Sequence, residues 1–248
     1  MRSGQATIGC FLGLGSPNVA ELLAHAGFDW LVIETEHNGL DSAEIEHMLM
    51  AMNGTDVVPI VRIPSANPVF IQRALDIGGM GVIVPMVRTA EEARAIVRAT
   101  RYPPEGARSF GPLRASHYGL DNADYLERAN EHMLVALILE TKEAVTNLEA
   151  IMSVDGIDAI YLGTYDLCLS LGLNPIYQPY AEIDAIIERT LELGREKNVA
   201  IGHGANSPDG LRQIQAQGFT MLGYGPDYNL MAKAAREGIA AFERQTVS

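Results

Sequence analysis

The feature that most constrains the fold is a regular alternation of short apolar runs with amphipathic segments. Eight strand-like runs occupy residues 7–12, 28–36, 57–63, 81–84, 134–140, 157–162, 199–202 and 220–224. Eight segments with apolar residues at three- and four-residue spacing follow them, at residues 18–26, 41–52, 68–77, 89–100, 141–152, 181–197, 207–217 and 227–242. Apolar runs of this kind are typical of parallel strands buried on both faces. Eight such units predict a closed (β/α)₈ TIM barrel of the α/β class rather than an open doubly wound sheet.

The alternation fills the chain, so we expect one barrel domain over residues 1–248, a usual size for this architecture. Gly13-Leu14-Gly15 lacks the third glycine of a dinucleotide-binding loop and is interpreted as a turn. One connection, residues 102–130, is unusually long. Long ordered loops at the catalytic end of a barrel are usually functional, and we expect the same of this one.

Composition limits the partners. The chain has 31 acidic and 18 basic residues and a formal net charge of −13, which argues against nucleic acid or an anionic membrane. A small anionic substrate stays possible, because one Arg or a metal ion reverses the field locally. The apolar runs fall short of the ~18 residues that cross a bilayer, and a cytoplasmic location is expected. Cys10 and Cys168 are expected to be buried, reduced thiols.

Charged residues stand at the ends of several predicted strands. Glu34, Glu36 and His37 end one run, Arg62 ends the next, and Glu140 and Asp166 follow two later runs. The carboxyl ends of barrel strands are where such folds build active sites. The pattern therefore predicts an enzyme.

Glu140 and Asp166 follow consecutive strands, so both are expected on the same rim of the barrel. Two carboxylates without cysteine suit a hard divalent cation such as Mg²⁺ or Mn²⁺, with water and substrate oxygens as further ligands. The alternative is that Glu140 caps the next helix and Asp166 holds a loop.

His37 and Arg62 each allow two interpretations. His37, with acids one and three residues before it, suits a general acid–base unit, although a carbonyl-bonded structural histidine fits a lone His better. Arg62 at a buried strand end needs an anion, which is either an acid such as Glu36 or a substrate carboxylate or enolate. Beside two metal-binding carboxylates, the substrate is favoured.

Glycines mark the ends of the last two strands, at Gly202-His203-Gly204 and Gly223-Tyr224-Gly225. Many barrels bind phosphate at these places. No lysine lies nearby in the sequence, and turn glycines are the preferred interpretation.

An ordered set of motifs resembles the HpcH/HpaI group of metal-dependent pyruvate aldolases over nearly the whole chain. These motifs are Ala24-His25-Ala26-Gly27-Phe28-Asp29-Trp30, Glu36-His37, Val61-Arg62, Val84-Pro85-Met86-Val87, Arg101-Tyr102-Pro103-Pro104, Glu140-Thr141 and Gly163-Thr164-Tyr165-Asp166-Leu167. The resemblance implies a (β/α)₈ barrel assembled as a homo-oligomer, commonly a hexamer, whose last helix packs on a neighbouring subunit. The apolar residues of segment 227–242 suit such an interface, and packing on its own barrel is the alternative.

The resemblance also implies site roles. Glu140 and Asp166 would bind a divalent metal ion (Mg²⁺, Mn²⁺ or Co²⁺), and Arg62 would contact the keto or enolate oxygen. His37, beside Glu34, would support proton transfer from the 4-hydroxyl group through metal-bound water. Asp76 matches a further acidic position, and Thr164 and Tyr165 lie beside the metal ligand as substrate-binding residues. The chain departs from the best-matched members at Glu34, Ile138 and Tyr165, where those members have Asp, Gln and Ala.

The implied reaction is reversible aldol cleavage of a 4-hydroxy-2-oxo acid to pyruvate, or a related 2-oxo acid, and an aldehyde. The three lysines, Lys142, Lys197 and Lys233, fall on predicted helices or their ends, so no Schiff base is expected. The main alternative is a metal-dependent oxaloacetate decarboxylase or another enolate-forming lyase on the same site. A 2-oxo-acid binding protein without turnover ranks below both.

Overall fold

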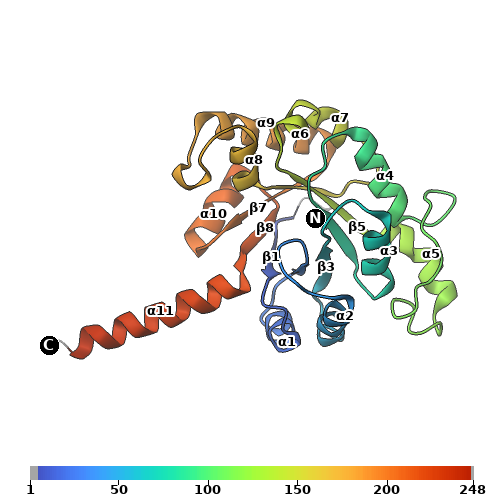
Figure 1. Cartoon of the computed structure of the whole chain (residues 1–248), viewed down its shortest axis with the longest axis horizontal. Helices are drawn as coiled ribbons and strands as arrows, with labels where there is room; N and C mark the ends of the chain where they lie inside the picture. Colours follow the sequence, from blue (N-terminus) through green and yellow to red (C-terminus); the bar gives the residue numbers. More distant parts are fainter. Residues whose placement is uncertain (1–4, 247–248) are drawn as a thin grey trace.

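The computed structural model describes the backbone of residues 5–246 and the side chains of residues 5–242, and its core is a closed parallel barrel. The strands pair in sequence order and β8 closes on β1, which confirms the predicted (β/α)₈ fold (Figure 1). They are β1 (Thr7–Leu12), β2 (Trp30–Glu34), β3 (Val58–Arg62), β4 (Gly81–Val84), β5 (Leu134–Leu139), β6 (Ala159–Leu162), β7 (Ala200–Ala205) and β8 (Met221–Pro226).

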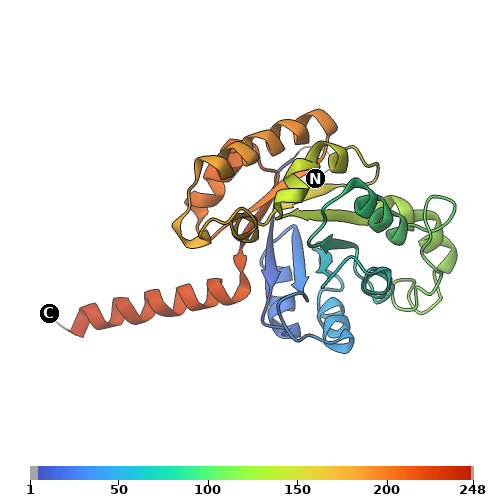
Figure 2. The ribbon, with the colours of Figure 1, turned by 45° about the horizontal axis from the view of Figure 1, so that its top comes forward.

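Helices surround the barrel, with one exception. They are α1 (Pro17–His25), α2 (Ser42–Ala51), α3 (Pro68–Asp76), α4 (Ala90–Thr100), α5 (Asn122–His132), α6 (Lys142–Thr146), α7 (Leu148–Met152), α8 (Thr164–Ser170), the 3₁₀ turn η1 (Pro175–Tyr177), α9 (Ala181–Lys197), α10 (Pro208–Gln217) and α11 (Asp227–Thr246). Figure 2 shows α11 extending away from the ring that the other helices form. No helix among the described residues is long and apolar enough to cross a membrane. The cytoplasmic location stays a prediction.

The helix starts follow from local sequence. Asp41 and Thr89 each form a capping box with the glutamate three residues later, Glu44 and Glu92. Thr141 accepts a hydrogen bond from the backbone N–H of Ala144. Such side chains satisfy amide groups that the first helical turn leaves without a partner. The helical segments predicted over residues 41–52, 89–100 and 141–152 begin at these three residues.

Two details differ from the prediction. The segment expected as one helix over 141–152 forms two, α6 and α7, which meet at Asn147, whose side chain donates to the Arg88 carbonyl. Helix α8 was not predicted, because it is one short segment directly after Gly163 and has little room for a periodic pattern.

Aromatic side chains and glycines share the barrel interior. Trp30, Phe11 and Tyr161 point inward, and the Phe11 ring meets the other two edge-on, at centroid distances of 6.1 Å and 5.3 Å. A Cβ atom on Gly9 would lie 2.0 Å from the Trp30 ring. The interior is therefore close-packed, with glycine on one strand making room for a large ring on the next.

The long connection lies at the opposite end of the barrel from the carboxyl ends of the strands, because it joins the end of α4 to the start of β5. It packs beside the end of α3, where the backbone N–H of Ala115 donates to the Asp76 carbonyl and Arg114 donates to the Ile77 carbonyl. The expectation of a loop at the catalytic end is wrong. Residues 102–130 therefore do not border the carboxyl ends of the strands.

Both cysteines are buried and free, as predicted. Burial raises the pKa of the Cys10 thiol to about 12, and the nearby Asp227 contributes to the same shift. The thiol therefore stays protonated at neutral pH, which makes it a poor nucleophile.

Gly9→Ala is expected to destabilise the fold by about 1–3 kcal/mol, because the added methyl group overlaps the Trp30 ring in a packed interior. Chemical denaturation of the two proteins measures the difference. Gly238→Ala, at an exposed helical position with no atom within 4 Å of the added Cβ, is the control and should cause no loss. Equal stability of the Gly9 variant and the wild type would contradict the packing described here.

Candidate functional site

A pocket of about 540 Å³ opens at the carboxyl end of the barrel. Most of the predicted site residues line it: Glu34, His37, Arg62, Glu140, Thr164, Tyr165 and Asp166. Phe11, Ile138 and Tyr161 contribute side chains from within the barrel. The fold thus gathers groups that are far apart in the sequence into one cavity.

Arg62 lies between two carboxylates. Glu34 and Arg62 are register partners on β2 and β3, and Glu34 Oε2 accepts from Arg62 Nη1 at 2.7 Å. Arg62 Nη2 forms a second ion pair with Glu36. The Arg62 side chain is only 13% exposed, and the two bound carboxylates offset the cost of burying its charge. The sequence left open whether an acid of the chain or a substrate pairs with Arg62. The structure shows acids of the chain, and Glu34 and Glu36 both form ion pairs with it.

One nitrogen of this Arg is left over. Arg62 Nε is buried and has no hydrogen-bond partner among the described residues. A buried donor of this kind is costly unless it meets an acceptor. Because Arg62 lines the pocket, a ligand oxygen is a fitting acceptor.

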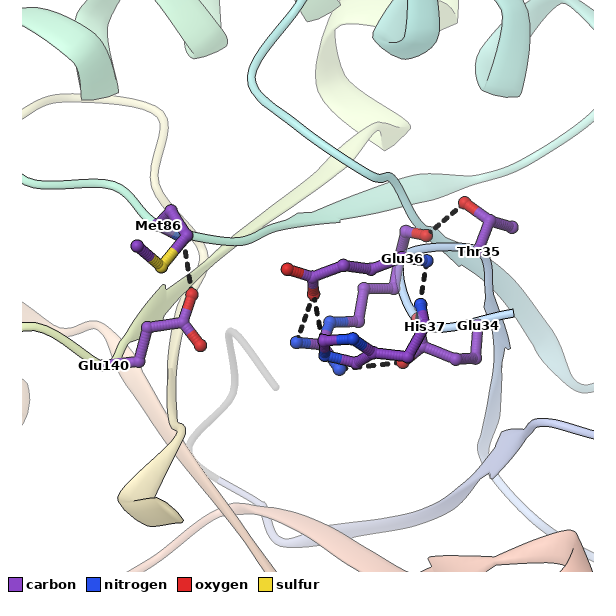
Figure 3. A network of polar contacts seen from close by, with 7 residues as sticks. Glu34, Thr35, Glu36, His37, Met86 and Glu140 are labelled. Carbon is purple, nitrogen blue, oxygen red and sulfur yellow. Dashed lines mark hydrogen bonds and ion pairs between the residues drawn. The ribbon is translucent and has the colours of Figure 1, made fainter. Parts of the chain in front are cut away.

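His37 is held through its backbone rather than its ring. Glu34 Oε1 accepts from the backbone N–H groups of Glu36, at 2.7 Å, and His37, at 3.2 Å. The His37 side chain is 62% exposed, and its Nε2 lies 3.5 Å from Glu36 Oε2 (Figure 3). Glu34 therefore shapes the turn after β2, and Glu36 is the acid beside the imidazole.

Burial raises the pKa of Glu36, while Arg62 and His37 act in the opposite direction and Glu34 and Asp166 add to the rise. The pocket therefore carries more negative than positive groups. An additional cation would lower the energy of this arrangement.

Glu140 stands apart from this cluster and is almost fully buried (Figure 3). Its Oε1 accepts from the backbone N–H of Met86, which adopts a left-handed conformation with φ 58°. Such a conformation is unfavourable for a non-glycine residue and is found where function requires it. A Cβ on Gly163 would lie 2.9 Å from Glu140 Cβ, so Gly163 leaves the space that the carboxylate occupies.

Burial raises the pKa of Glu140, and although the Met86 hydrogen bond and Arg62 oppose the rise, Glu36 and Asp166 reinforce it. Asp166 lies in the first turn of α8 and lines the same pocket. The two carboxylates also border a second cleft, together with Arg88, Lys142 and Ser170.

The two carboxylates fit a divalent cation. Among the side chains of residues 5–242, no three His, Cys, Asp or Glu are grouped so that they alone could hold a metal. Glu140 and Asp166 would therefore supply two oxygen ligands, and water and substrate the others. The negative charges of Glu36 and Asp166 near Glu140 favour this role, because a dication stabilises the charged form of a buried carboxylate.

Asp76 does not join the pocket within the chain. It ends α3, at the opposite end of the barrel, and its carboxylate accepts from Arg108 Nη2 at 2.6 Å. The Arg108 guanidinium also lies 4.6 Å from the centre of the Tyr102 ring. In this chain Asp76 anchors the long connection.

Sequence reasoning underrated three contributors to the site. Glu36 was considered as an acid beside His37 and as one candidate partner for Arg62, but not as a site residue in its own right. Met86 contributes a backbone N–H that no side-chain pattern reveals, and Tyr161 lies within an apolar run that predicts only a buried strand. The glycines of β7 and β8 are a related case. Gly202, Gly204 and Gly223 lie within strands rather than in turns, and each leaves space for the Tyr161 side chain. The interpretation as turn glycines is wrong for these three.

Comparison with known proteins identifies the family of the chain. The family model of the HpcH/HpaI aldolase/citrate lyase family matches residues 7–234. A hydroxypyruvate/pyruvate aldolase of Roseovarius nubinhibens is 37% identical over 97% of this chain and 93% of the relative. A 4-hydroxy-2-oxo-heptane-1,7-dioate aldolase of Escherichia coli is 38% identical over 100% of this chain and 95% of the relative. The crystal structure of an HpcH/HpaI aldolase/citrate lyase family protein from Burkholderia cenocepacia J2315 superposes with a TM-score of 0.91 at 32% identity, covering 97% of this chain and 95% of that one. The chain belongs to the HpcH/HpaI aldolase/citrate lyase family.

Proposed function

We propose that this protein is a divalent-metal-dependent aldolase, a carbon–carbon lyase. It reversibly cleaves a 4-hydroxy-2-oxo acid to pyruvate, or a related 2-oxo acid, and an aldehyde. The observation that carries the proposal is the single pocket that holds Glu140, Asp166, Arg62 and His37 in a chain whose full-length relatives are aldolases.

A divalent cation held by Glu140 and Asp166 would act as a Lewis acid on the 2-oxo group and stabilise the negative charge that develops there. Mg²⁺, Mn²⁺ and Co²⁺ all suit two carboxylates with open positions. The Met86 N–H group and Gly163 hold the Glu140 carboxylate in place.

Arg62 stabilises the enolate. Its terminal nitrogens are bound to Glu34 and Glu36, which fixes the plane of the guanidinium, and its Nε is left as the donor for a substrate oxygen. As the C3–C4 bond breaks, the electron pair moves into the pyruvate enolate, whose oxygen Arg62 contacts. A donor fixed before the reaction costs little reorganisation.

His37 removes the proton of the 4-hydroxyl group. Breaking the C3–C4 bond converts C4 into an aldehyde carbonyl, so the 4-hydroxyl group must lose its proton. His37 lines the pocket with an exposed ring beside Glu36, and this carboxylate favours the imidazolium that proton uptake creates. The enolate then takes a proton from solvent at C3 to give pyruvate, and His37 releases its proton to solvent.

Thr164 and Tyr165 are proposed to border the substrate. Both belong to the start of α8, next to Asp166, and Tyr165 is 61% exposed. At that position Tyr165 meets the part of the substrate nearest the mouth, where the aldehyde departs.

Glu140→Gln is expected to lower aldolase activity by about 100-fold or more, because the amide keeps the shape of the side chain but loses the charge that binds the cation. Pyruvate release from a 4-hydroxy-2-oxo acid by metal-stripped protein, with Mg²⁺, Mn²⁺ or Co²⁺ added back, measures the effect. Glu91→Gln, on the exposed first turn of α4, is the control. Full activity after chelation, or in the Glu140 variant, would contradict the metal mechanism.

His37→Ala should slow aldol cleavage by about 100-fold while sparing the decarboxylation of oxaloacetate, because only the first reaction removes a hydroxyl proton. Both reactions release pyruvate, so one coupled assay follows them. His47→Ala, an exposed residue of α2, is the matched control. A variant that loses both activities equally would contradict the proposed base, and a wild-type protein that acts on oxaloacetate alone would favour the decarboxylase.

A homo-oligomer, such as a hexamer, is part of the proposal. Met231, Ile239 and Phe242 of α11 are more than half exposed, and their spacing places them on one face of the helix. Beyond its first turn, α11 leaves the barrel, so packing on its own barrel does not cover that face (Figure 1). Asp76 enters the proposed reaction only where a neighbouring copy brings it to the pocket.

Light scattering on the purified protein should give a mass several times that of one chain. The double variant Ile239→Glu with Phe242→Glu should reduce it, because it places charges on the apolar face. Lys233→Glu, on the opposite face of α11, is the control. A wild-type protein of single-chain mass would contradict the oligomer.

A further inference from the structure

Tyr161 lines the pocket but has no role in the reaction described above. Tyr161 lies on β6, where Ala159, Tyr161 and Gly163 alternate toward the barrel interior. It lines the pocket one step below Gly163 and is the register partner of Ile138 on β5. The ring therefore forms part of the pocket floor, close to where Glu140 and Asp166 would hold the substrate.

The barrel is built around this ring. A Cβ on Gly202 would lie 2.4 Å from Tyr161 Cδ2, and a Cβ on Gly223 would lie 2.3 Å from the Tyr161 hydroxyl oxygen. A Cβ on Gly204 would lie 3.1 Å from the same oxygen. Three glycines on two neighbouring strands thus leave space for one side chain, and the edge of Phe11 meets the other side of the ring. The position of the hydroxyl group is fixed by packing.

The hydroxyl group has no partner of its own. It forms no hydrogen bond with any described residue, and the neighbouring floor residues Phe11 and Ile138 offer only apolar side chains. Burial raises the pKa of Tyr161, so the phenol stays protonated and able to donate at neutral pH. Tyrosine hydroxyl groups in protein interiors usually find a partner, and because Tyr161 lines the pocket, a bound ligand is a fitting one.

Given the proposed aldolase reaction, we propose that Tyr161 determines donor specificity by hydrogen-bonding the 2-oxo acid from the pocket floor. The partner atom belongs either to the carboxylate or keto group, which all 2-oxo acids share, or to a hydroxyl group on C3, as in hydroxypyruvate. A phenol fixed at this depth favours a donor with a polar atom facing the floor and disfavours one that presents a methyl group there.

Tyr161→Phe tests this inference, because it removes one oxygen atom and keeps the ring that the three glycines accommodate. In the aldol addition direction, at a fixed aldehyde concentration, the KM of the donor should rise about tenfold, with kcat and the KM of the aldehyde unchanged. The melting temperature should stay the same, since the hydroxyl group bonds no residue of the fold. Tyr224→Phe is the matched control, because Tyr224 follows Gly223 on β8 and packs toward the helices.

Pyruvate and hydroxypyruvate as donors separate the two partner atoms. An equal loss for both places the hydrogen bond on the shared carboxylate or keto group, and a loss for hydroxypyruvate alone places it on the 3-hydroxyl group. Unchanged donor KM values in an active variant, or a change confined to the aldehyde KM, would overturn the inference. If the wild-type protein shows no turnover with any metal, the proposed function fails instead. Calorimetric titration of pyruvate and hydroxypyruvate into wild type and variant, with Mn²⁺ present, then decides the role of Tyr161 by binding alone.

Discussion

The site depends on a buried arginine that two carboxylates neutralise. Arg62 on β3 pairs with Glu34, its register neighbour on β2, and with Glu36 in the turn that follows. Without these acids the guanidinium could not stay at the mouth of the barrel, because an unpaired buried charge is strongly destabilising. Glu34 also accepts from the backbone of Glu36 and His37, so the same pair sets the path of the turn that carries the imidazole.

Across the pocket, Glu140 is arranged by opposite means. A backbone N–H from the strained Met86 and the absence of a side chain at Gly163 place the carboxylate, and no cationic side chain of residues 5–242 bonds to it directly. One wall of the pocket therefore has its charges paired within the protein, and the other has two carboxylates left for a cation. This asymmetry separates the groups proposed for proton transfer and enolate binding from those proposed for the metal.

Glycines leave the space for the large rings inside the barrel. Gly9 leaves space for Trp30, and Gly202, Gly204 and Gly223 leave space for Tyr161. Each large ring therefore fills the interior opposite glycines on neighbouring strands. The rings form a rigid floor, and the polar groups of the strand ends stand above it. A chain that used ordinary side chains at these glycine positions could not place Tyr161 there.

The sequence by itself determined the eight βα units, the starts of α2, α4 and α6, and which charged residues follow the strands, because these depend on periodicity, capping and nearest neighbours. It also correctly predicted that Glu34, His37, Arg62, Glu140 and Asp166 share one pocket, since parallel strands deliver their ends to one rim. Only the tertiary structure decided that Arg62 binds two acids, that Asp76 bonds Arg108 at the opposite end, and that the glycines of β7 and β8 serve Tyr161. Those outcomes depend on side-chain direction and on distances between residues far apart in the chain, and neither is encoded in local pattern.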